Sequence, residues 1–393
     1  MIAFMFPGQG SQRPGAGRPW SDHPSWEVVR AASDAARRDI AHLLLDADAD
    51  ELRSTDNAQL STYVASLLVL DAVRRQGLDA TFVAGHSLGE YTALTAAGAI
   101  SLEDGVQLVC ERGAAMRAAC ETTEGTMAAV LGAEDDAIEA LCSSCQAEGH
   151  SVWVANFNAP GQVVIAGSAE GVETAGARAK TIGAKRVMPV AVSGAFHTPF
   201  MATAQTRLDA ALADAHFHQT TVAVATNVDA AIHHRDAPWA ELLSRQLCSP
   251  VRWSPLLASL TAAGVKTFVE IGPGTVLSGL AKRGAPGSAG HAAAIPEEVD
   301  SLAGALSETA SAASRQAGET LHAAERLVVS PAAGVFAPEE NLRDGDRIAA
   351  GDVIGRVGGQ VVTSRFSGRL MGVLAWRGER VAAWQPLLWL RAF

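Results

Sequence analysis

Short apolar runs, followed by stretches with apolar residues at helical spacing, recur along the first three quarters of the chain. The continuous runs predict buried strands at residues 2–6, 81–85, 221–228 and 267–271. Apolar spacing of three and four residues predicts helices between them, at residues 25–46, 57–76, 91–97, 102–120, 199–213, 238–248, 252–263 and 275–283. Strands that alternate with helices are typical of an α/β domain built around a parallel sheet.

A different pattern interrupts this alternation at residues 124–191. Four strands are predicted there, at 126–131, 151–157, 161–166 and 185–192, with helices at 134–148 and 169–182. The order β-α-β-β-α-β is that of a ferredoxin-like unit. Because alternating strands and helices resume afterwards, we expect a compact insertion in the larger domain. The stretch Asn156–Gly161 has the composition of a turn between the two middle strands.

The C-terminal quarter has another composition. Alanine, glycine and serine dominate residues 284–326, which we interpret as a connector with a helix at 300–325. Residues 327–393 contain short strands separated by glycine-rich turns. Two segments of this region recur: Ser330–Gly334 as Ser364–Gly368, and Gly345–Ala350 as Gly378–Ala383. Two related halves predict a pseudo-twofold, flattened all-β barrel.

Composition and charge limit the possible partners. Hydrophobic residues make up 48% and charged residues 19% of the 393 residues, which is typical of a globular protein with a large core. The net charge of −11 argues against a nucleic-acid partner, because phosphate binding needs a basic surface. No apolar run approaches the roughly 18 residues of a membrane span, and residues 1–6 lack the basic start of a signal peptide. We expect a cytoplasmic protein without a membrane partner.

The five cysteines form no disulfide pattern. Cys142 and Cys145 have the spacing of metal ligands, but no second pair completes a set of four. We therefore predict two ordinary residues on a helix and no metal site.

The stretch Gly85–Glu90 carries the strongest chemical signal. Its Gly-x-Ser-x-Gly pattern lies between a predicted buried strand and a predicted helix, which is the setting of a nucleophile elbow. The flanking glycines permit a sharp turn that exposes the Ser87 hydroxyl at the positive end of the helix. Ser87 is therefore the candidate nucleophile, and the rest of the chain must supply a base and an oxyanion site.

Candidates for these partners lie elsewhere in the chain. His197 stands directly before Thr198-Pro199, a predicted helix start whose dipole favours the neutral imidazole. Gln9 lies in a glycine-rich loop that lacks the third glycine or the lysine of nucleotide-binding loops, so it is either a polar loop residue or an amide beside the nucleophile. Arg112 lies next to the apolar face of its helix, where it could also be an ordinary helical arginine.

Residues 1 to about 308 resemble the malonyl-CoA:acyl-carrier-protein transacylases of fatty-acid and polyketide synthesis. The matching motifs occur in the family's order: Phe6–Gln12, Gly85–Glu90, Glu111–Gly113, Asn156–Gly167, Ala195–His197, Arg245-Gln246 before Pro250-Val251, and Glu270–Gly274. The resemblance implies a hydrolase-like α/β subdomain that carries a ferredoxin-like insertion, in agreement with the pattern above.

The resemblance also implies a role for each site residue. Ser87 would be the nucleophile and His197 its base, with the main-chain carbonyl of Gln246 orienting the imidazole in place of an acidic third member. The main-chain N–H groups of Gln9 and Leu88 would form the oxyanion hole. Arg112 would bind the malonyl carboxylate, and Phe196 would crowd an α-methyl branch. The malonyl group would pass from coenzyme A to Ser87 and then to a phosphopantetheine thiol of an acyl carrier protein, without a bound cofactor.

The last residues, 327–393, resemble biotinyl and lipoyl carrier domains, which would follow an acyltransferase domain at 1–308 and a linker at 309–326. The family attaches its prosthetic group to a lysine in the hairpin between the two halves. Here that stretch is Arg356–Val362, and the last lysine of the chain is Lys282. We therefore expect a structural or docking module and no working carrier.

Three functions remain open from the sequence. The first is malonyl transfer to a carrier protein, the second is an acyl hydrolase that clears stalled chains from carriers, and the third is an inactive carrier-binding scaffold. Arg112 favours the first over the second, because a hydrolase of this kind gains nothing from a carboxylate-binding cation. The intact set of Ser87, His197, Gln9, Arg112 and Gln246 argues against the third.

Overall fold

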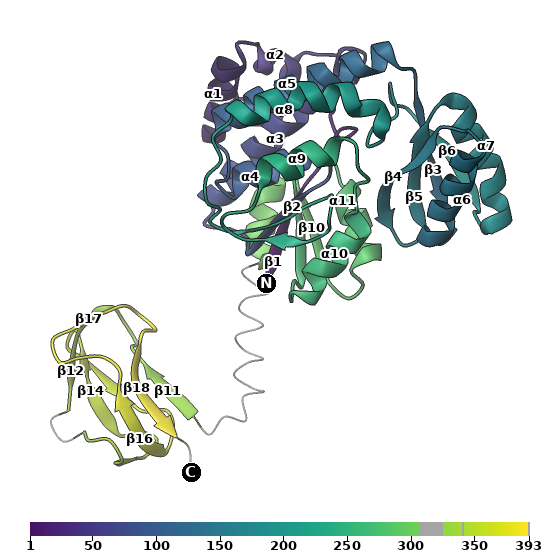
Figure 1. Cartoon of the computed structure of the whole chain (residues 1–393). Coiled ribbons are helices and arrows are strands. Elements are labelled where there is room, and N and C mark those ends of the chain that lie inside the picture. The colour runs from purple at the N-terminus through teal and green to yellow at the C-terminus, as the bar shows by residue number, and fades with distance from the viewer. Residues whose placement is uncertain (307–324, 340–341, 392–393) are drawn as a thin grey trace. The chain divides into compact units, whose positions relative to one another are not determined.

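A computed structural model describes residues 1–306, 325–339 and 342–391. The chain forms two compact units, Met1–Ala305 and Leu306–Phe393, and each is described by itself (Figure 1).

The first unit is built on a six-stranded sheet. Its strands are β1 (Ile2–Phe6), β2 (Phe82–Gly85), β7 (Ala223–Ala225), β8 (Ile232–His233), β9 (Thr267–Ile271) and β10 (Ala289–Ala293). The order is β10-β9-β1-β2-β7-β8, with all neighbours parallel except the β7–β8 pair. The continuous apolar runs of β1, β2 and β9 are buried along nearly their whole length, as expected for a parallel sheet covered by helices.

Nine labelled α-helices of this unit, as far as it is described, accompany the main sheet in the order of the chain, and a further helix begins at residue 296. The nine are α1 (Glu27–Ala36), α2 (Ile40–Leu45), α3 (Thr55–Arg75), α4 (Gly89–Ala96), α5 (Leu102–Thr122), α8 (Ala202–Asp214), α9 (Trp239–Leu247), α10 (Trp253–Ala262) and α11 (Val276–Gly284). One core cluster joins Met5 and Phe82 of the sheet to Trp253 of α10 and Leu277 of α11. The prediction of an α/β fold around a parallel sheet is confirmed.

The helix predicted at 25–46 is wrong in one respect, because the chain breaks it into α1 and α2. Arg37 ends α1 in the left-handed conformation, with φ of 50°. Asp39 then caps α2, its side chain accepting a hydrogen bond from the His42 N–H at 2.9 Å. The apolar spacing continues across the break, so it could not reveal it.

The connector predicted from residue 284 is wrong at its start. Residues 289–293 form β10, which pairs in parallel with β9, and a helix begins at residue 296 and continues to 306. Val299 and Leu302 of that helix are buried. Small side chains obscured this edge strand, because pairing there depends on the backbone. Most of the helix predicted at 300–325 and of the linker at 309–326 lies outside the described residues.

A second, four-stranded sheet is inserted between α5 and α8. Its elements are β3 (Thr126–Leu131), α6 (Asp135–Ala147), β4 (Val152–Ala159), β5 (Gln162–Gly167), α7 (Ala169–Ala179) and β6 (Arg186–Val190). The order is β4-β5-β3-β6 and every pair is antiparallel. The helices cover one face, where Cys142 and Cys145 are buried as free thiols in the core.

The turn predicted at Asn156–Gly161 is mostly strand. β4 runs to Ala159 with two shifts of register, and only Pro160 and Gly161 connect it to β5. The Phe157 N–H donates to the Val251 carbonyl at 2.9 Å, and the Val251 N–H donates to the Ala155 carbonyl at 2.9 Å. These bonds keep the backbone extended, although asparagine and glycine are typical of turns.

The second unit contains two four-stranded sheets, ordered β11-β18-β16-β13 and β15-β14-β12-β17. The strands are β11 (Glu325–Val329), β12 (Gly334–Pro338), β13 (Arg347–Ile348), β14 (Val353–Val357), β15 (Gln360–Thr363), β16 (Gly368–Val373), β17 (Arg380–Val381) and β18 (Pro386–Arg391). Exchanging β11–β14 for β15–β18 converts one order into the other. The two halves of the sequence repeat thus occupy equivalent places around a core that includes Phe336 and Leu370.

Within the described part of the chain, every helix is too short or too polar to cross a membrane.

Candidate active site

Ser87 lies at the turn between β2 and α4. Its φ is 52°, in the left-handed region that a serine seldom adopts. A Cβ at Gly85 would overlap the main chain of Gly89, and a Cβ at Gly89 would overlap the Phe6 carbonyl. Only glycine fits at both flanking positions, so the chain can turn sharply enough to present the serine hydroxyl.

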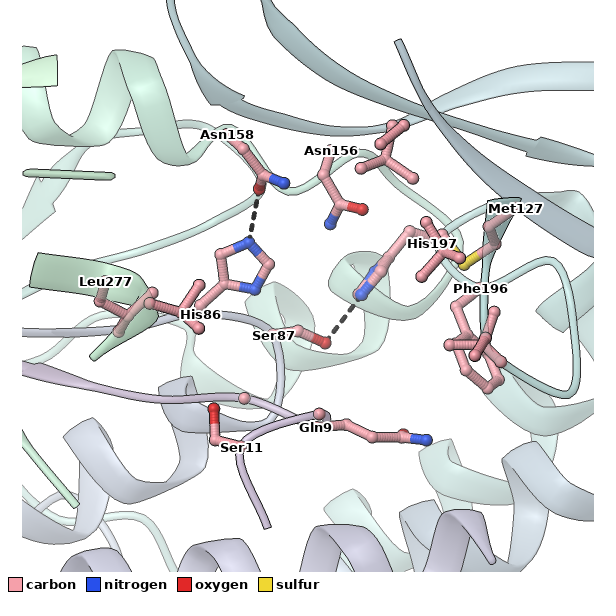
Figure 2. A pocket seen from close by; sticks show the side chains of 18 of the residues that line it. Gln9, Ser11, His86, Ser87, Met127, Asn156, Asn158, Phe196, His197 and Leu277 are labelled. Atoms are coloured by element: carbon pink, nitrogen blue, oxygen red, sulfur yellow. Dashed lines mark hydrogen bonds between the residues drawn. The ribbon is translucent and has the colours of Figure 1, made fainter. Parts of the chain in front are cut away.

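Ser87 and His197, which are 110 residues apart in sequence, are in direct contact (Figure 2). Ser87 Oγ lies 2.7 Å from His197 Nε2, and His197 Nδ1 lies 2.9 Å from the main-chain carbonyl of Gln246. Because a carbonyl oxygen can only accept, Nδ1 carries the proton and donates it. Nε2 is therefore free to accept the hydrogen bond from the Ser87 hydroxyl.

Burial holds His197 in its neutral form. Its pKa is lowered to about 3, mainly by burial and then by the positive charge of Arg112, while the bond to the Gln246 carbonyl opposes the shift. At neutral pH the ring is thus an unprotonated acceptor. This is the state that a general base requires.

Arg112 of α5 reaches the same serine. The side chain is 1% exposed, and Nη2 donates to Ser87 Oγ at 3.0 Å and to Gln246 Oε1 at 3.1 Å. Nη1 donates to Gln59 Oε1 at 2.6 Å, and the guanidinium carbon lies 5.5 Å from the centre of the Tyr91 ring. None of the ion pairs among the described residues includes Arg112. Arg112 is therefore a buried cation whose direct hydrogen-bond acceptors are all neutral.

A cavity of about 710 Å³ opens over Ser87 and His197. Figure 2 shows Gln9, Phe196 and Met127 around these two residues, and all three line the cavity. Much of its wall is apolar and comes from the uncovered face of the second sheet, including Ala129 of β3, Val164 of β5 and Val190 of β6. The cavity is large enough for a chain longer than a small acyl group.

Two main-chain donors near Ser87 have no acceptor among the described residues. Leu88 is the N-cap residue of α4, and Gln9 follows β1 in the adjacent loop. Among the hydrogen bonds of the described residues, none employs the main-chain N–H of either. Free N–H groups at a helix start are suited to a developing oxyanion.

Residues 3–315 match the model of a known family, which is described as an acyl transferase domain. The chain belongs to this acyl transferase family. A malonyl CoA-acyl carrier protein transacylase of Bacillus subtilis is 43% identical over 284 residues, which are 72% of this chain and 90% of that protein.

Solved structures of the family are also similar. An acyl-carrier-protein S-malonyltransferase from Burkholderia pseudomallei is 40% identical, with a TM-score of 0.73 over 77% of this chain and 99% of its own. A malonyl-transacylase in complex with a type II polyketide synthase acyl-carrier protein is 35% identical, with a TM-score of 0.72 over 76% and 97%. The α/β fold is shared with these acyltransferases.

The acyltransferase site contains all the residues that the sequence singled out. Ser87, His197, Arg112 and Gln246 are joined by hydrogen bonds, and Gln9 and Phe196 line the cavity beside them. The resemblance assigns Gln246 a role through its main-chain carbonyl. Its side chain also takes part, because Nε2 donates to the Ser87 carbonyl at 3.0 Å.

Other residues of the site were missed. Asn227 binds the main chain on both sides of His86, and Gln59 is an acceptor for Arg112. The Glu90 carboxyl accepts a hydrogen bond from Gln246 Nε2 at 2.8 Å, and burial raises its pKa to about 7. Asn227 follows β7, the strand next to β2, at the carboxyl edge where α/β sheets carry their sites. Its position near the end of a predicted strand is the feature of the sequence that could have identified Asn227 as a site residue.

Proposed function

We propose that this acyltransferase moves a malonyl group from malonyl-CoA to the phosphopantetheine thiol of an acyl carrier protein, through a malonyl ester on Ser87. The observation that carries the proposal is Arg112, a buried cation that forms no ion pair with a carboxylate among the described residues and whose Nη2 lies 3.0 Å from Ser87 Oγ. An acyl group attached to Ser87 Oγ begins beside this guanidinium, so an acyl group that ends in a carboxylate is favoured.

In the first half-reaction, His197 Nε2 takes the hydroxyl proton while Ser87 Oγ attacks the thioester carbonyl of malonyl-CoA. The oxyanion that forms is bound by the free N–H groups of Leu88 and Gln9. The carbon–sulfur bond then breaks, and the coenzyme A thiolate leaves with the proton from His197. The imidazolium exists only between these two steps, and the Gln246 carbonyl stabilises it through Nδ1.

The second half-reaction reverses these roles. The phosphopantetheine thiol of the carrier gives its proton to His197 and attacks the Ser87 ester. The carbon–oxygen bond breaks, and Ser87 recovers its proton from His197. Side chains and main-chain groups of this chain account for every proton transfer, so the proposed mechanism needs only the thioester donor and the thiol acceptor, without a cofactor.

Selectivity for malonyl follows from the neutral acceptors around Arg112. A guanidinium can bind a carboxylate through two parallel hydrogen bonds, and it gains more from that than from the amide oxygens of Gln59 and Gln246. An acetyl group offers no such acceptor. We propose that Phe196, on the cavity wall, excludes an α-methyl branch.

The names of the relatives support both malonyl-CoA as the proposed donor and an acyl carrier protein as the proposed acceptor. One curated relative is a malonyl CoA-acyl carrier protein transacylase, and one similar structure is a malonyl-transacylase bound to a polyketide synthase carrier protein. We therefore place the reaction in fatty-acid or polyketide synthesis.

The experiment that tests this function is mass spectrometry of the intact protein after incubation with malonyl-CoA. We expect a mass increase of one malonyl group, located on Ser87 and absent from Ser87→Ala. Adding a phosphopantetheine-bearing carrier protein should return the mass to its starting value and load the carrier. Release of free malonate instead would support the hydrolase, and a protein that stays unmodified would exclude the proposed transfer.

We also propose finer assignments for the fold. The elbow at the end of β2 in a parallel sheet supports a hydrolase-like subdomain, and the order β4-β5-β3-β6 supports a ferredoxin-like insertion. The paired sheets and repeated halves of the second unit support a biotinyl- or lipoyl-like barrel. Its β14–β15 hairpin turns at Gly358 and Gly359, without the lysine that would carry a prosthetic group.

Deleting residues 327–393 is expected to leave the rate of Ser87 acylation within about twofold of the full chain, since a unit with its own core is separable. The residues proposed for catalysis all lie in Met1–Ala305. The measurement is the rate of adduct formation with malonyl-CoA, with a thermal melt as a control for folding. Complete loss of acylation in a folded truncation would contradict the assignment of a separate module.

A further inference from the structure

Asn227 is fully buried at the carboxyl end of β7, beside the strand that leads to Ser87. Its side-chain oxygen accepts a hydrogen bond from the Ser87 N–H at 2.7 Å. Its side-chain nitrogen donates to the Gly85 carbonyl at 2.7 Å. One amide group thus binds the main chain on both sides of His86, the residue before the nucleophile.

The main chain of Asn227 is also fixed. The Arg252 N–H donates to the Asn227 carbonyl at 3.0 Å, and the Asn227 N–H donates to Glu90 Oε2 at 3.1 Å. The same Glu90 oxygen accepts the bond from Gln246 Nε2, and the Gln246 carbonyl holds His197. Asn227 is therefore connected to the nucleophile directly and to the base through two buried side chains.

The elbow needs such support because Ser87 adopts a left-handed conformation. A residue other than glycine in this region is strained and persists only where its surroundings hold it. The Ser87 N–H precedes the first turn of α4, where N–H groups have no partner within the helix. The amide of Asn227 supplies that partner and fixes the rotation of the chain at the serine.

We propose that Asn227 is a positioning residue, which holds the strained turn at Ser87 so that the hydroxyl meets His197 and the Leu88 N–H stays free. This role rests on the proposed function of Ser87 as a nucleophile. It requires a group that accepts on one side and donates on the other, and a neutral amide does both. A carboxylate would accept from Ser87 but repel the Gly85 carbonyl and Glu90.

The test uses the full chain with Asn227→Ala and Asn227→Asp. Reaction of Ser87 with a fluorophosphonate probe reports its nucleophilicity independently of any malonyl group, and acylation by malonyl-CoA is measured in parallel. We expect Asn227→Ala to slow both reactions about 100-fold, the effect of a small misplacement of reacting groups. Affinity for malonyl-CoA, measured with each change in a Ser87→Ala background, should stay within about threefold.

The pH dependence of Asn227→Asp distinguishes positioning from a merely structural role. Once protonated, the introduced carboxyl has one acceptor and one donor, like the amide. The rate at which Asn227→Asp reacts with the probe, relative to wild type, should therefore rise about tenfold as the pH falls from about 8 to about 5. The corresponding ratio for Asn227→Ala should stay constant, because alanine has no group to protonate.

Asn57→Ala is the matched control, because Asn57 also accepts from one group (Arg38) and donates to a main-chain carbonyl (Glu51) on the surface of the same unit. It should react like wild type. A folded Asn227→Ala variant that reacts with the probe at the wild-type rate would overturn the proposal. So would a rate of Asn227→Asp, relative to wild type, that does not change with pH. If the probe labels wild type normally but malonyl-CoA does not, the proposed function fails while the role of Asn227 is still decided by the probe.

Discussion

Replacing His197 with alanine is expected to slow acylation of Ser87 by malonyl-CoA roughly 10³- to 10⁴-fold, the full contribution of a positioned general base. Among the described residues, Ser87 Oγ has one proton acceptor at hydrogen-bond distance, His197 Nε2 at 2.7 Å. The other close group, Arg112 Nη2, is a donor and cannot take a proton. Water would have to replace the imidazole in a buried site, without the orientation that the Gln246 carbonyl provides.

The measurement is the rate of the first turnover, monitored as formation of the malonyl adduct on intact protein. His216→Ala is the matched control, since His216 is exposed and takes no part in the site. A His197→Ala variant that acylates within about tenfold of wild type would contradict its role as the base. Affinity for malonyl-CoA should change little, because the imidazole acts on the proton.

The pH dependence of the wild-type enzyme gives an independent check on His197. A lowered pKa favours the neutral ring, so the base is available at every pH above about 3. The acylation rate should therefore show no loss at the ordinary histidine pKa of about 6.5. Burial raises the pKa of Glu90 to about 7, so any inflection there should disappear in Glu90→Gln. An inflection near 6.5 that survives in Glu90→Gln would show that His197 is ordinarily basic.

The proposed nucleophile and base could be predicted because each is marked by local chemistry. Glycines on both sides of Ser87 are required by the turn itself, and Pro199 after His197 marks a helix start. Asn227 carries no such mark, and Glu90 ends the Gly85–Glu90 motif without a role that the motif assigns to it. Their importance comes from hydrogen bonds across 140 and 137 residues of sequence, to Ser87 and to each other. Spacing along the chain does not contain that information, which arises only when β2 and β7 pair.

The errors in the predicted secondary structure have a similar origin. Residues 156–159 have turn composition but are held extended by main-chain bonds to Val251. Ala289–Ala293 has few large apolar side chains, yet it adds an edge strand because β9 offers a row of unpaired main-chain groups. At Arg37 the chain leaves the helical conformation while the apolar spacing continues. In each case tertiary pairing or one backbone angle outweighs the side-chain pattern.

Replacing Arg112 with alanine is expected to reduce the preference for malonyl-CoA over acetyl-CoA roughly 10²- to 10³-fold. Removing one partner of a buried charge pair costs about 3–5 kcal/mol, and each 1.4 kcal/mol is tenfold in a rate or binding constant. The loss should fall on malonyl, whose carboxylate would then be buried without a partner. Acetyl-CoA should be accepted better relative to malonyl-CoA, because no desolvated cation remains beside the acyl group.

The ratio of kcat/KM for the two substrates is the measurement of choice for Arg112→Ala. The change leaves the oxygens of Gln59 and Gln246 without a donor, at a cost of about 1–3 kcal/mol each in stability. A ratio taken within one variant is insensitive to such a loss, because both substrates meet the same population of folded enzyme. Arg117→Ala on the same helix is the control, since Arg117 is half exposed and pairs with Asp56. If Arg112→Ala keeps the wild-type ratio, the carboxylate is recognised elsewhere and the selectivity proposed for this site is wrong.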